Sequence, residues 1–359
     1  MPVHPSTHLT RRTAATLCAL LALAGCAKSE DSAAPQTQGT GGAQVAQTPA
    51  GSGPECTLQQ YGGSQLDLKN AVVGFAQSEK EANPFRIAET QSIKDEAAKV
   101  GVKQLLTTNA NSQLSKQIAD IQDMINKGAQ ALIVAPLNSD GLEPALAAAR
   151  AKNIPVLTID RKVNATACKD YVAFLGSNFV EQGKRAAQEM AKALGNKGKV
   201  AILLGASGNN VTTDRTNGFV DELKASAPDV QIVAQQTGEF ARDKGQQVME
   251  QIIQAQQGIT GVYAENDEMA LGALVALRSA GKNPGKDIQL VSIDGTRNAV
   301  QKIVDGDLYA VVESNPRFGP LAFQTLKAFL SGAPVRQNVV ISDKLYGKDN
   351  ATPELTSAY

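Results

Sequence analysis

The sequence predicts an α/β protein with two parallel β-sheets, and three observations carry this prediction. From residue 69 onward, short apolar runs of strand length alternate with amphipathic stretches of helix length. The apolar runs are continuous, which is typical of parallel strands that helices cover on both faces. Ten such runs are many for one sheet and comfortable for two.

The order of the elements along the chain supports two sheets. Strands are expected at residues 71–75, 104–107, 131–135, 156–159, 172–175, 200–204, 230–234, 262–264, 290–293 and 310–312. Helices are expected between most of them, among others at residues 87–99, 114–127, 143–152, 180–194 and 267–280. Ligands of such sheets bind beyond the carboxyl ends of the strands, so we look for function just after each run.

The first 68 residues predict export and membrane attachment rather than a fold. Two arginines precede the apolar run 14–24, which has the length of a signal h-region and is too short to span a bilayer. The run leads into the sequence LAGC, ending at Cys26, which resembles the lipobox of bacterial lipoproteins. We expect a signal peptide at 1–25, acylation of Cys26 and a flexible tether at 26–68. The alternative is an ordinary cleaved signal with a chance cysteine.

Histidine and charge counts exclude several function classes. The two histidines, His4 and His8, lie ahead of the apolar run, so the processed protein has no imidazole. Ser-His-Asp or Cys-His catalysis and histidine-ligated metal sites need that side chain, and we expect no metal or other cofactor. With 35 basic and 35 acidic residues, the chain has no basic excess for the phosphates of a nucleic acid.

Two cysteines remain in the exported body of the protein. Cys18 leaves with the signal peptide and Cys26 takes the lipid, so Cys56 and Cys168 are left. An even pair of thiols outside the cytosol predicts a disulfide. Two independent thiols are the alternative, because the sequence does not place them within bonding distance.

Polar and aromatic side chains that suit a small polyol follow the predicted strands. The candidate ligand-binding residues are Phe85, Arg86, Asp160, Arg161, Arg215, Phe240, Asn266 and Asp294. Carboxylates and amides bond to hydroxyl groups, arginine gives planar bidentate bonds, and phenylalanine rings pack on C–H faces. Simpler roles are open for most of them: a surface ion pair for Asp160-Arg161, a position at a helix N-terminus without ligand contact for Asp214-Arg215, and helix capping for Asn266. Asp294 could belong to a simple turn, and the phenylalanines could pack in the core.

Several of these motifs together resemble the periplasmic sugar-binding proteins of the ribose-binding family. Asp160-Arg161, Asp214-Arg215, NDEMALGA at 266–273 and SIDGT at 292–296 occur in that family's order, and the resemblance covers roughly residues 69–345. Other segments, such as GFAQ at 74–77 and GEF at 238–240, look most like the galactofuranose-binding branch. These proteins are the substrate-binding components of ABC importers.

The resemblance implies a fold of two Rossmann-like lobes joined by a three-segment hinge, the periplasmic-binding-protein type I fold. The first lobe would comprise 69–177 and 316–341, and the second 178–315 and 342–359. The implied ligand is a monosaccharide. Galactofuranose or a related furanose is favoured over galactopyranose and ribose. The implied partner is a membrane-embedded ABC permease, and the protein would be a non-enzymatic monomer, anchored by its lipid in the periplasm or at the cell surface.

The resemblance also assigns roles to the candidate residues. Phe85 and Phe240 match the aromatic positions that sandwich the sugar ring, and Arg86 matches a first-loop arginine suited to an exocyclic diol. The ring hydroxyls would be held by Asp160, Arg161, Arg215, Asn266 and Asp294. The sequence departs from the pattern in two regions. Residues 313–315 read ESN where ribose binders carry a glutamine. Phe85 stands where the galactofuranose-binding branch has a tryptophan, and the loop before it looks one residue longer than in that branch.

Three other functions compete with sugar delivery. A transcription regulator of the same fold would need an N-terminal DNA-binding domain and no export signal. An exported glycoside hydrolase needs two carboxyl groups about 5–9 Å apart; Asp160 and Asp294 could serve, but we expect Arg161 and Arg215 to keep both ionised. The sequence does not distinguish a sugar receptor that signals to a membrane kinase from a sugar-binding protein that serves transport.

Overall fold

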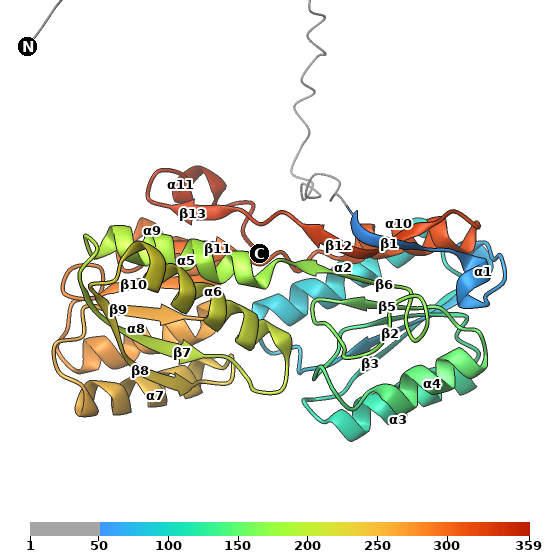
Figure 1. Ribbon diagram of the computed structural model, residues 1–359, viewed down its shortest axis with the longest axis horizontal. Helices are drawn as coiled ribbons and strands as arrows, with labels where there is room; N and C mark the ends of the chain where they lie inside the picture. Colours follow the sequence, from blue (N-terminus) through green and yellow to red (C-terminus); the bar gives the residue numbers. More distant parts are fainter. Residues whose placement is uncertain (1–50) are drawn as a thin grey trace, which may run out of the picture. The chain divides into compact units, whose positions relative to one another are not determined.

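The computed structural model describes residues 51–359, which belong to one compact unit with two α/β lobes, each built on its own sheet (Figure 1). The two-sheet prediction is therefore confirmed. The first sheet has seven strands in the order β1 (Gly51–Cys56), β12 (Val335–Ile341), β6 (Ala173–Ser177), β5 (Val156–Ile159), β4 (Ala131–Val134), β2 (Val72–Gln77) and β3 (Gln104–Asn109).

The second sheet has six strands. Their order is β13 (Leu345–Gly347), β11 (Ala310–Glu313), β10 (Gln289–Asp294), β9 (Gly261–Ala264), β7 (Gly198–Leu204) and β8 (Val230–Thr237). The chain passes between the two sheets three times: between β6 and α5 (Phe179–Ala193), between β11 and α10 (Gly319–Leu330), and between β12 and β13.

The prediction of wholly parallel sheets is wrong at one edge of each sheet. β1 pairs antiparallel with β12, and β13 pairs antiparallel with β11, whereas the other pairs are parallel. The strands β1, β12 and β13 were not predicted. β1 is a polar segment with no strand pattern, and it is ordered by pairing with residues almost at the other end of the chain.

Helices cover both faces of each sheet (Figure 1). In the first lobe, α2 (Pro84–Val100) packs with α10 on one face, and α3 (Leu114–Asn126) packs with α4 (Glu143–Ala151) on the other. In the second lobe, α5 and α6 (Asn210–Ser226) cover one face, and α7 (Arg242–Ala255), α8 (Asp267–Ser279) and α9 (Arg297–Val304) cover the other. Short helical turns lie at α1 (Leu58–Tyr61), η1 (Leu68–Asn70) and α11 (Ala351–Glu354).

Four helices that follow a strand begin with an asparagine cap. Asn83, Asn178, Asn209 and Asn266 each accept a hydrogen bond from the backbone N–H three residues later, at the starts of α2, α5, α6 and α8. A side-chain oxygen at this position satisfies an N–H group that has no partner within the helix. These caps fix the polar loops that leave the carboxyl ends of β2, β6, β7 and β9.

Residues 51–68 belong to the first lobe, so the flexible tether predicted for 26–68 is wrong in this part. β1 extends the first sheet, and Thr57 caps α1 by accepting a bond from the Gln60 N–H. The remaining tether, the signal peptide at 1–25 and Cys26 lie outside the described residues. Among residues 51–359, no helix is long and apolar enough to cross a membrane.

A disulfide joins Cys56 and Cys168, the pair that the sequence singled out. Their Cα atoms lie 5.2 Å apart, and 112 positions separate them in the sequence. Cys56 ends β1 and is fully buried, while Cys168 lies in the loop between β5 and β6. The bond therefore fixes the N-terminal strand to the body of the first lobe.

Candidate functional site

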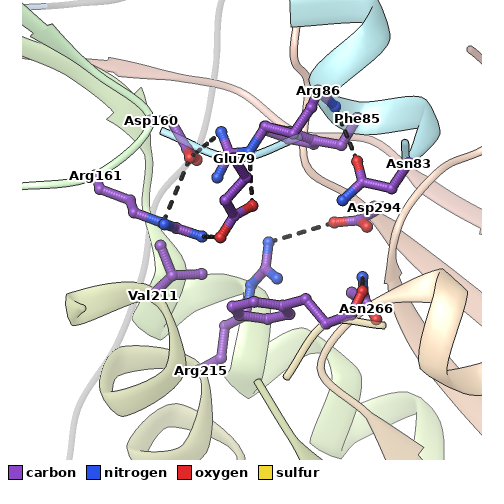
Figure 2. A pocket seen from close by; sticks show the side chains of 11 residues that line it. Glu79, Asn83, Phe85, Arg86, Asp160, Arg161, Val211, Arg215, Asn266 and Asp294 are labelled. Atoms are coloured by element: carbon purple, nitrogen blue, oxygen red, sulfur yellow. Dashed lines mark hydrogen bonds and ion pairs between the residues drawn. The ribbon is translucent and has the colours of Figure 1, made fainter. Parts of the chain in front are cut away.

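All eight predicted site residues line one pocket at the carboxyl ends of the strands (Figure 2). Its empty volume, open solvent at the mouth included, is ≈ 330 Å³. The sequence did not predict three further lining residues, Glu79, Asn83 and Val211. Because both lobes contribute walls, a ligand held here would touch the two lobes at once.

The start of α2 places Phe85 and Arg86 in the pocket. Asn83 caps the helix by accepting a 2.9 Å hydrogen bond from the Arg86 N–H, and Pro84 occupies the first helical position. Proline suits this position because its fixed φ is helical and its missing N–H would have no helical partner. The loop that departs from the family pattern is therefore an ordinary helix start, with both site residues in the first turn.

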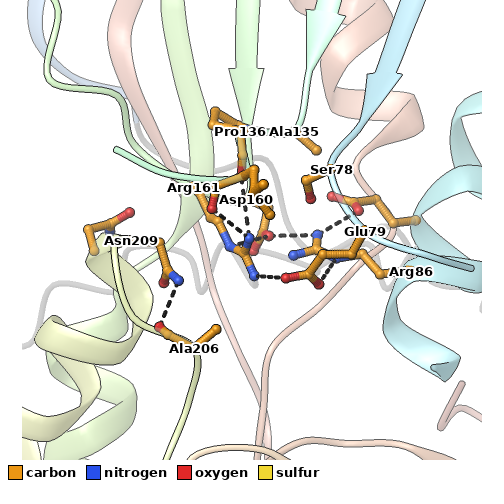
Figure 3. A network of polar contacts seen from close by, with 12 residues as sticks. Ser78, Glu79, Arg86, Ala135, Pro136, Asp160, Arg161, Ala206 and Asn209 are labelled. Atoms are coloured by element: carbon orange, nitrogen blue, oxygen red, sulfur yellow. Dashed lines mark hydrogen bonds and ion pairs between the residues drawn. The ribbon is translucent and has the colours of Figure 1, made fainter. Parts of the chain in front are cut away.

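Arg86 and Arg161 are held by Glu79 and Asp160 in a ring of ion pairs (Figure 3). Glu79 accepts from Arg86 Nε at 3.0 Å and from Arg161 Nη2 at 2.7 Å. Asp160 accepts from Arg86 Nη1 at 2.7 Å and lies 3.8 Å from Arg161 Nε. Burial would raise the pKa of Glu79, but the charges of Arg161 and Arg86 outweigh it and lower this pKa to about 2.

A third carboxylate, Glu89, lies behind Arg86 and is fully buried. It accepts from Arg86 Nη1 at 2.8 Å and from Gln77 Nε2 at 2.9 Å. Burial raises the pKa of Glu89 to about 7, against the charge of Arg86, which lowers it. Arg86 is thus held from three sides, although no bond from its Nη2 joins it to any residue in the described part of the chain.

Arg215 is the cation of the second lobe, and close helix packing places it. Gly183 of α5 lies against the backbone of α6: a Cβ atom there would come within 2.1 Å of the Arg215 carbonyl oxygen. The side chain donates from Nε to Gln182 Oε1 at 2.9 Å and from Nη1 to the Glu265 carbonyl at 2.6 Å. Its Nη2 points to Asp294 at 3.7 Å, beyond hydrogen-bond distance.

Asp294 offers a carboxylate with no hydrogen bond from residues 51–359. Burial raises its pKa well above the usual range, and the charge of Arg215 lowers it only in part. Arg215, at 3.7 Å, opposes this shift of the pKa without cancelling it, which differs from the expectation that the neighbouring arginines leave no acid with a raised pKa here. Hydroxyl groups of a ligand would supply the missing donors.

Asn266 combines two of the roles considered for it. It caps α8, because its Oδ1 accepts from the Met269 N–H at 2.9 Å. Its Nδ2 donates to the Phe240 carbonyl at 3.0 Å, and the side chain also lines the pocket. Capping and contact with the pocket are therefore compatible, and Asn266 fixes the loop that carries Phe240.

Asp267 has a role that the sequence did not reveal. It accepts hydrogen bonds from Ser292 Oγ at 2.5 Å, from the N–H groups of Gly295 and Thr296, and from Thr296 Oγ1. These bonds hold the turn after β10, so Asp267 positions Asp294. Its side chain is fully buried, so Asp267 is neither a solvated residue nor merely a charge at the helix start.

Three site residues have left-handed backbone conformations. The φ angles of Asp160, Phe240 and Asp294 are 62°, 60° and 139°. For non-glycine residues this costs on the order of 1–3 kcal/mol each and persists only where the surrounding structure enforces it. Such strain clusters at functional sites, and here it aims three side chains into one pocket.

The two phenylalanines lie on different lobes and each contacts an arginine. The Arg86 guanidinium lies 5.0 Å from the centre of the Phe85 ring, and that of Arg161 lies 5.9 Å from the Phe240 ring. The Phe240 ring packs on Gly205, where a Cβ atom would come within 2.0 Å of the ring. The glycine-rich turn after β7 therefore makes room for the ring.

Tyr359, which was not among the predicted site residues, lies next to the site. Its ring packs edge-on against Phe85 at 6.2 Å, its hydroxyl donates to the Ser314 carbonyl at 3.3 Å, and Arg317 lies 5.7 Å from the ring centre. Tyr359 thus links the crossover from β11 to α10 with the aromatic wall of the pocket.

Comparisons with known proteins fit this geometry. A family model described as a periplasmic binding protein domain matches residues 73–334. Galactofuranose-binding protein YtfQ of Escherichia coli is 33% identical over 289 residues, 79% of this chain and 90% of that protein. Ribose import binding protein RbsB of Bacillus subtilis is 36% identical over 264 residues, which cover 73% of this chain and 83% of that protein.

A solved structure shows the same fold with a furanose bound. The periplasmic binding protein component of the arabinose ABC transporter from Shewanella sp. ANA-3, bound to α- and β-L-arabinofuranose, is similar with a TM-score of 0.76. The sequence identity is 33%, over 79% of this chain and 94% of that chain.

Proposed function

The chain belongs to the periplasmic binding protein family, and on this basis we propose that it captures a neutral furanose sugar for an ABC importer. Galactofuranose is the best candidate. The protein is a substrate-binding component and not an enzyme. The observation that carries the proposal is a single pocket, lined from both lobes by three carboxylates, three arginines and two phenylalanines.

The charge balance of the pocket favours a neutral polyol. Glu79, Asp160 and Asp294 oppose Arg86, Arg161 and Arg215, so the lining is balanced when all six groups are charged. Each of these three arginines already lies within 4 Å of a carboxylate of the lining. A carboxylate or phosphate on the sugar would therefore add a negative charge to a balanced lining, and burying an unpaired charge is costly. Hydroxyl groups both donate and accept, so they suit the open carboxylate of Asp294 as well as the arginines.

The choice of a furanose rests on Arg86 and on the relatives. A hexofuranose carries an exocyclic diol beyond its ring, and Arg86 has one nitrogen, Nη2, that is free of bonds within residues 51–359. Among the relatives, one is named for galactofuranose and one was solved with arabinofuranose. A five-membered ring between Phe85 and Phe240 would fit the position of Arg86 and the furanose ligands of these two relatives.

Closure of the two lobes would complete the site. Two hydrogen bonds join the lobes without using the candidate ligand-binding residues: the Ser139 N–H donates to the Gly208 carbonyl at 2.9 Å, and the Lys162 N–H donates to Asn210 Oδ1 at 2.8 Å. A ligand favours the closed state only if it touches that state more than the open one. A sugar touching both lobes meets this condition.

The export route and the partner are part of the proposal. Residues 1–25 would be removed, Cys26 acylated, and the segment from Cys26 to the start of β1 would tether the first lobe to the membrane, where an ABC permease receives the sugar. The first lobe would comprise 51–177 with 316–341, and the second 178–315 with 342–359. Labelling with a fatty acid in cells, compared with Cys26→Ser, tests the anchor: labelling of both or of neither contradicts it.

Isothermal titration of the purified protein against a panel of furanose and pyranose sugars tests the ligand. Methyl β-D-galactofuranoside and methyl β-D-galactopyranoside separate the ring forms, because neither interconverts in solution. We expect heat of binding for the furanoside and much weaker binding of the pyranoside and of ribose. Preference for the pyranoside would overturn the furanose assignment, and binding of no sugar would overturn the function.

A further inference from the structure

A second cavity adjoins the sugar pocket, and we call it the outer groove. It has an empty volume of ≈ 1560 Å³, against ≈ 330 Å³ for the sugar pocket. The two share Glu79, Asn83, Arg161 and Phe240 as walls. Because the same residues line both spaces, the two spaces lie next to each other.

The strand order places the outer groove at the end of the cleft away from the crossovers. Its walls come from the loops after β2, β3, β4 and β5 in the first lobe and after β7, β8 and β9 in the second. β3 and β8 end their sheets, whereas the crossovers leave from β6, β12 and β11 near the opposite edges. A substituent that points away from the crossovers would therefore enter the outer groove.

The boundary between the two spaces is an inter-lobe contact. Arg161 of the first lobe lies over the ring of Phe240 of the second, at 5.9 Å, and Glu79 holds Arg161 at 2.7 Å. Both residues line the sugar pocket as well as the outer groove, so they would contact the inner ring and the linkage to a second unit.

The lining of the outer groove has unused hydrogen-bonding capacity. The side chains of Lys80, Asn138 and Ser207 make no hydrogen bond to any residue between 51 and 359, and none of the three is buried. Lysine supplies donors, and asparagine and serine supply both donors and acceptors, all of which match hydroxyl groups. Most of the residues that line the outer groove are charged or polar.

The loop between β2 and α2 lines this groove. Glu79, Lys80, Ala82 and Asn83 of this loop are groove residues. Phe85 and Arg86, which line the sugar pocket, follow the loop at the start of α2. One loop and the helix that it leads into therefore contribute to both spaces.

We propose that the outer groove is a second subsite, which holds a sugar unit glycosidically linked to the furanose in the sugar pocket. The chain would then take furanosyl disaccharides and related glycosides in addition to the free monosaccharide. This rests on the function proposed above, because the inner ring must be bound for the outer unit to be placed.

Titration of the full chain with two ligands tests the subsite: methyl β-D-galactofuranoside, and a disaccharide with β-D-galactofuranose at its non-reducing end. We expect the disaccharide to bind about tenfold more tightly, which is the contribution of one or two net hydrogen bonds. Ser207→Trp fills the groove and should remove this tenfold gain, while the affinity for the methyl furanoside changes less than about twofold. Ser64→Trp is the matched control, because Ser64 is exposed and lines neither cavity.

The outcomes separate the subsite from the function on which it rests. If the methyl furanoside binds and the disaccharide does not, the subsite is overturned and the sugar-binding function stands. The subsite is also overturned if Ser207→Trp weakens both ligands equally, or no more than Ser64→Trp does. If neither ligand binds to any variant or to the wild type, the furanose function fails, and the subsite fails with it.

Discussion

The two halves of the sugar pocket are built differently. In the first lobe, Arg86 and Arg161 are tied to carboxylates by hydrogen bonds of 2.7–3.0 Å. In the second lobe, Arg215 is held by Gln182 and a backbone carbonyl, and its nearest carboxylate, Asp294, lies 3.7 Å away. The first half is thus internally paired, while the second contains an acidic group without a hydrogen bond in the described chain.

This difference suggests a division of labour. Charged groups that are already hydrogen-bonded to one another need little rearrangement when the sugar binds. The first lobe can therefore present a fixed surface that orients the sugar. An unpaired buried carboxylate is costly until a donor reaches it, so the second lobe gains most when the ligand arrives. The free energy that favours closure would then come mainly from Asp294 and its neighbours.

The largest effect is expected at the unpaired carboxylate. Asp294→Asn should weaken binding of every sugar by about 2–5 kcal/mol, because an amide NH₂ group replaces one of the two carboxyl oxygens that would accept from the hydroxyl groups of the sugar in this buried polar network. Calorimetry measures the change. Asp214→Asn is the matched control, since Asp214 precedes Arg215 but is only half-buried, and among residues 51–359 its side chain accepts only from Asn210. Equal losses in the two variants would contradict the division between the halves.

The disulfide makes a second difference between the lobes, since the second lobe has no cysteine in its sequence. Cys56→Ser with Cys168→Ser should lower the free energy of unfolding by about 2–4 kcal/mol. Because the bond lies in the first lobe, sugar affinity should stay nearly constant. Thiol counting on denatured, unreduced protein checks the bond itself, and two free thiols at Cys56 and Cys168 would refute it.

Stability should depend on pH in opposite directions for Glu265 and Glu79. Burial raises the pKa of Glu265 from 4.5 to about 7, so the folded protein holds this proton more tightly than the unfolded chain. Its contribution to stability is therefore lost as pH rises from about 4.5 to 7, by about 1–3 kcal/mol. Glu79, whose pKa is lowered to about 2, contributes stability above pH 4.5 that is lost only as pH falls toward 2.

Chemical denaturation of the wild type between pH 5 and 8 measures this slope. Glu265→Gln should flatten the decline in the free energy of unfolding, whereas Glu79→Gln should lower stability without changing the slope over this range. Glu89 and Asp267, with pKa values also raised to about 7, leave part of the slope in place. An unchanged slope in Glu265→Gln would show that this carboxyl is ionised in the folded protein.

A smaller, selective effect is expected in the first lobe. Arg86→Lys keeps the charge that Glu89 and Asp160 need but removes the planar fork. It should weaken binding of a hexofuranoside by about 1–2 kcal/mol and that of an arabinofuranoside, which has one carbon less, by clearly less. Equal losses for both ligands would show that Arg86 does not contact the exocyclic end.

Much of this site was predictable from the sequence because strand ends converge. Each of the eight candidates follows a predicted apolar strand, and parallel strands bring their carboxyl ends to one edge, so residues from 85 to 294 meet in one pocket. The asparagine and glycine positions that fix these loops are local signals of the same kind.

The remaining features depend on contacts between distant segments. Glu79 stands among other charged loop residues and is distinguished only by its bonds to Arg86 and Arg161. β1 has no strand pattern and is ordered by β12, and Tyr359 reaches Phe85 from the other end of the chain. Whether burial or Arg215 controls the pKa of Asp294 depends on a distance that no sequence pattern encodes.

The central claim is that one sugar bridges the two unequal halves and closes the lobes on itself. Small-angle X-ray scattering of the wild type, with and without saturating furanoside, measures this most directly. We predict a smaller radius of gyration with the sugar, and no such change for Asp294→Asn at the same ligand concentration. An unchanged wild-type profile, with binding established by calorimetry in the same sample, would contradict closure.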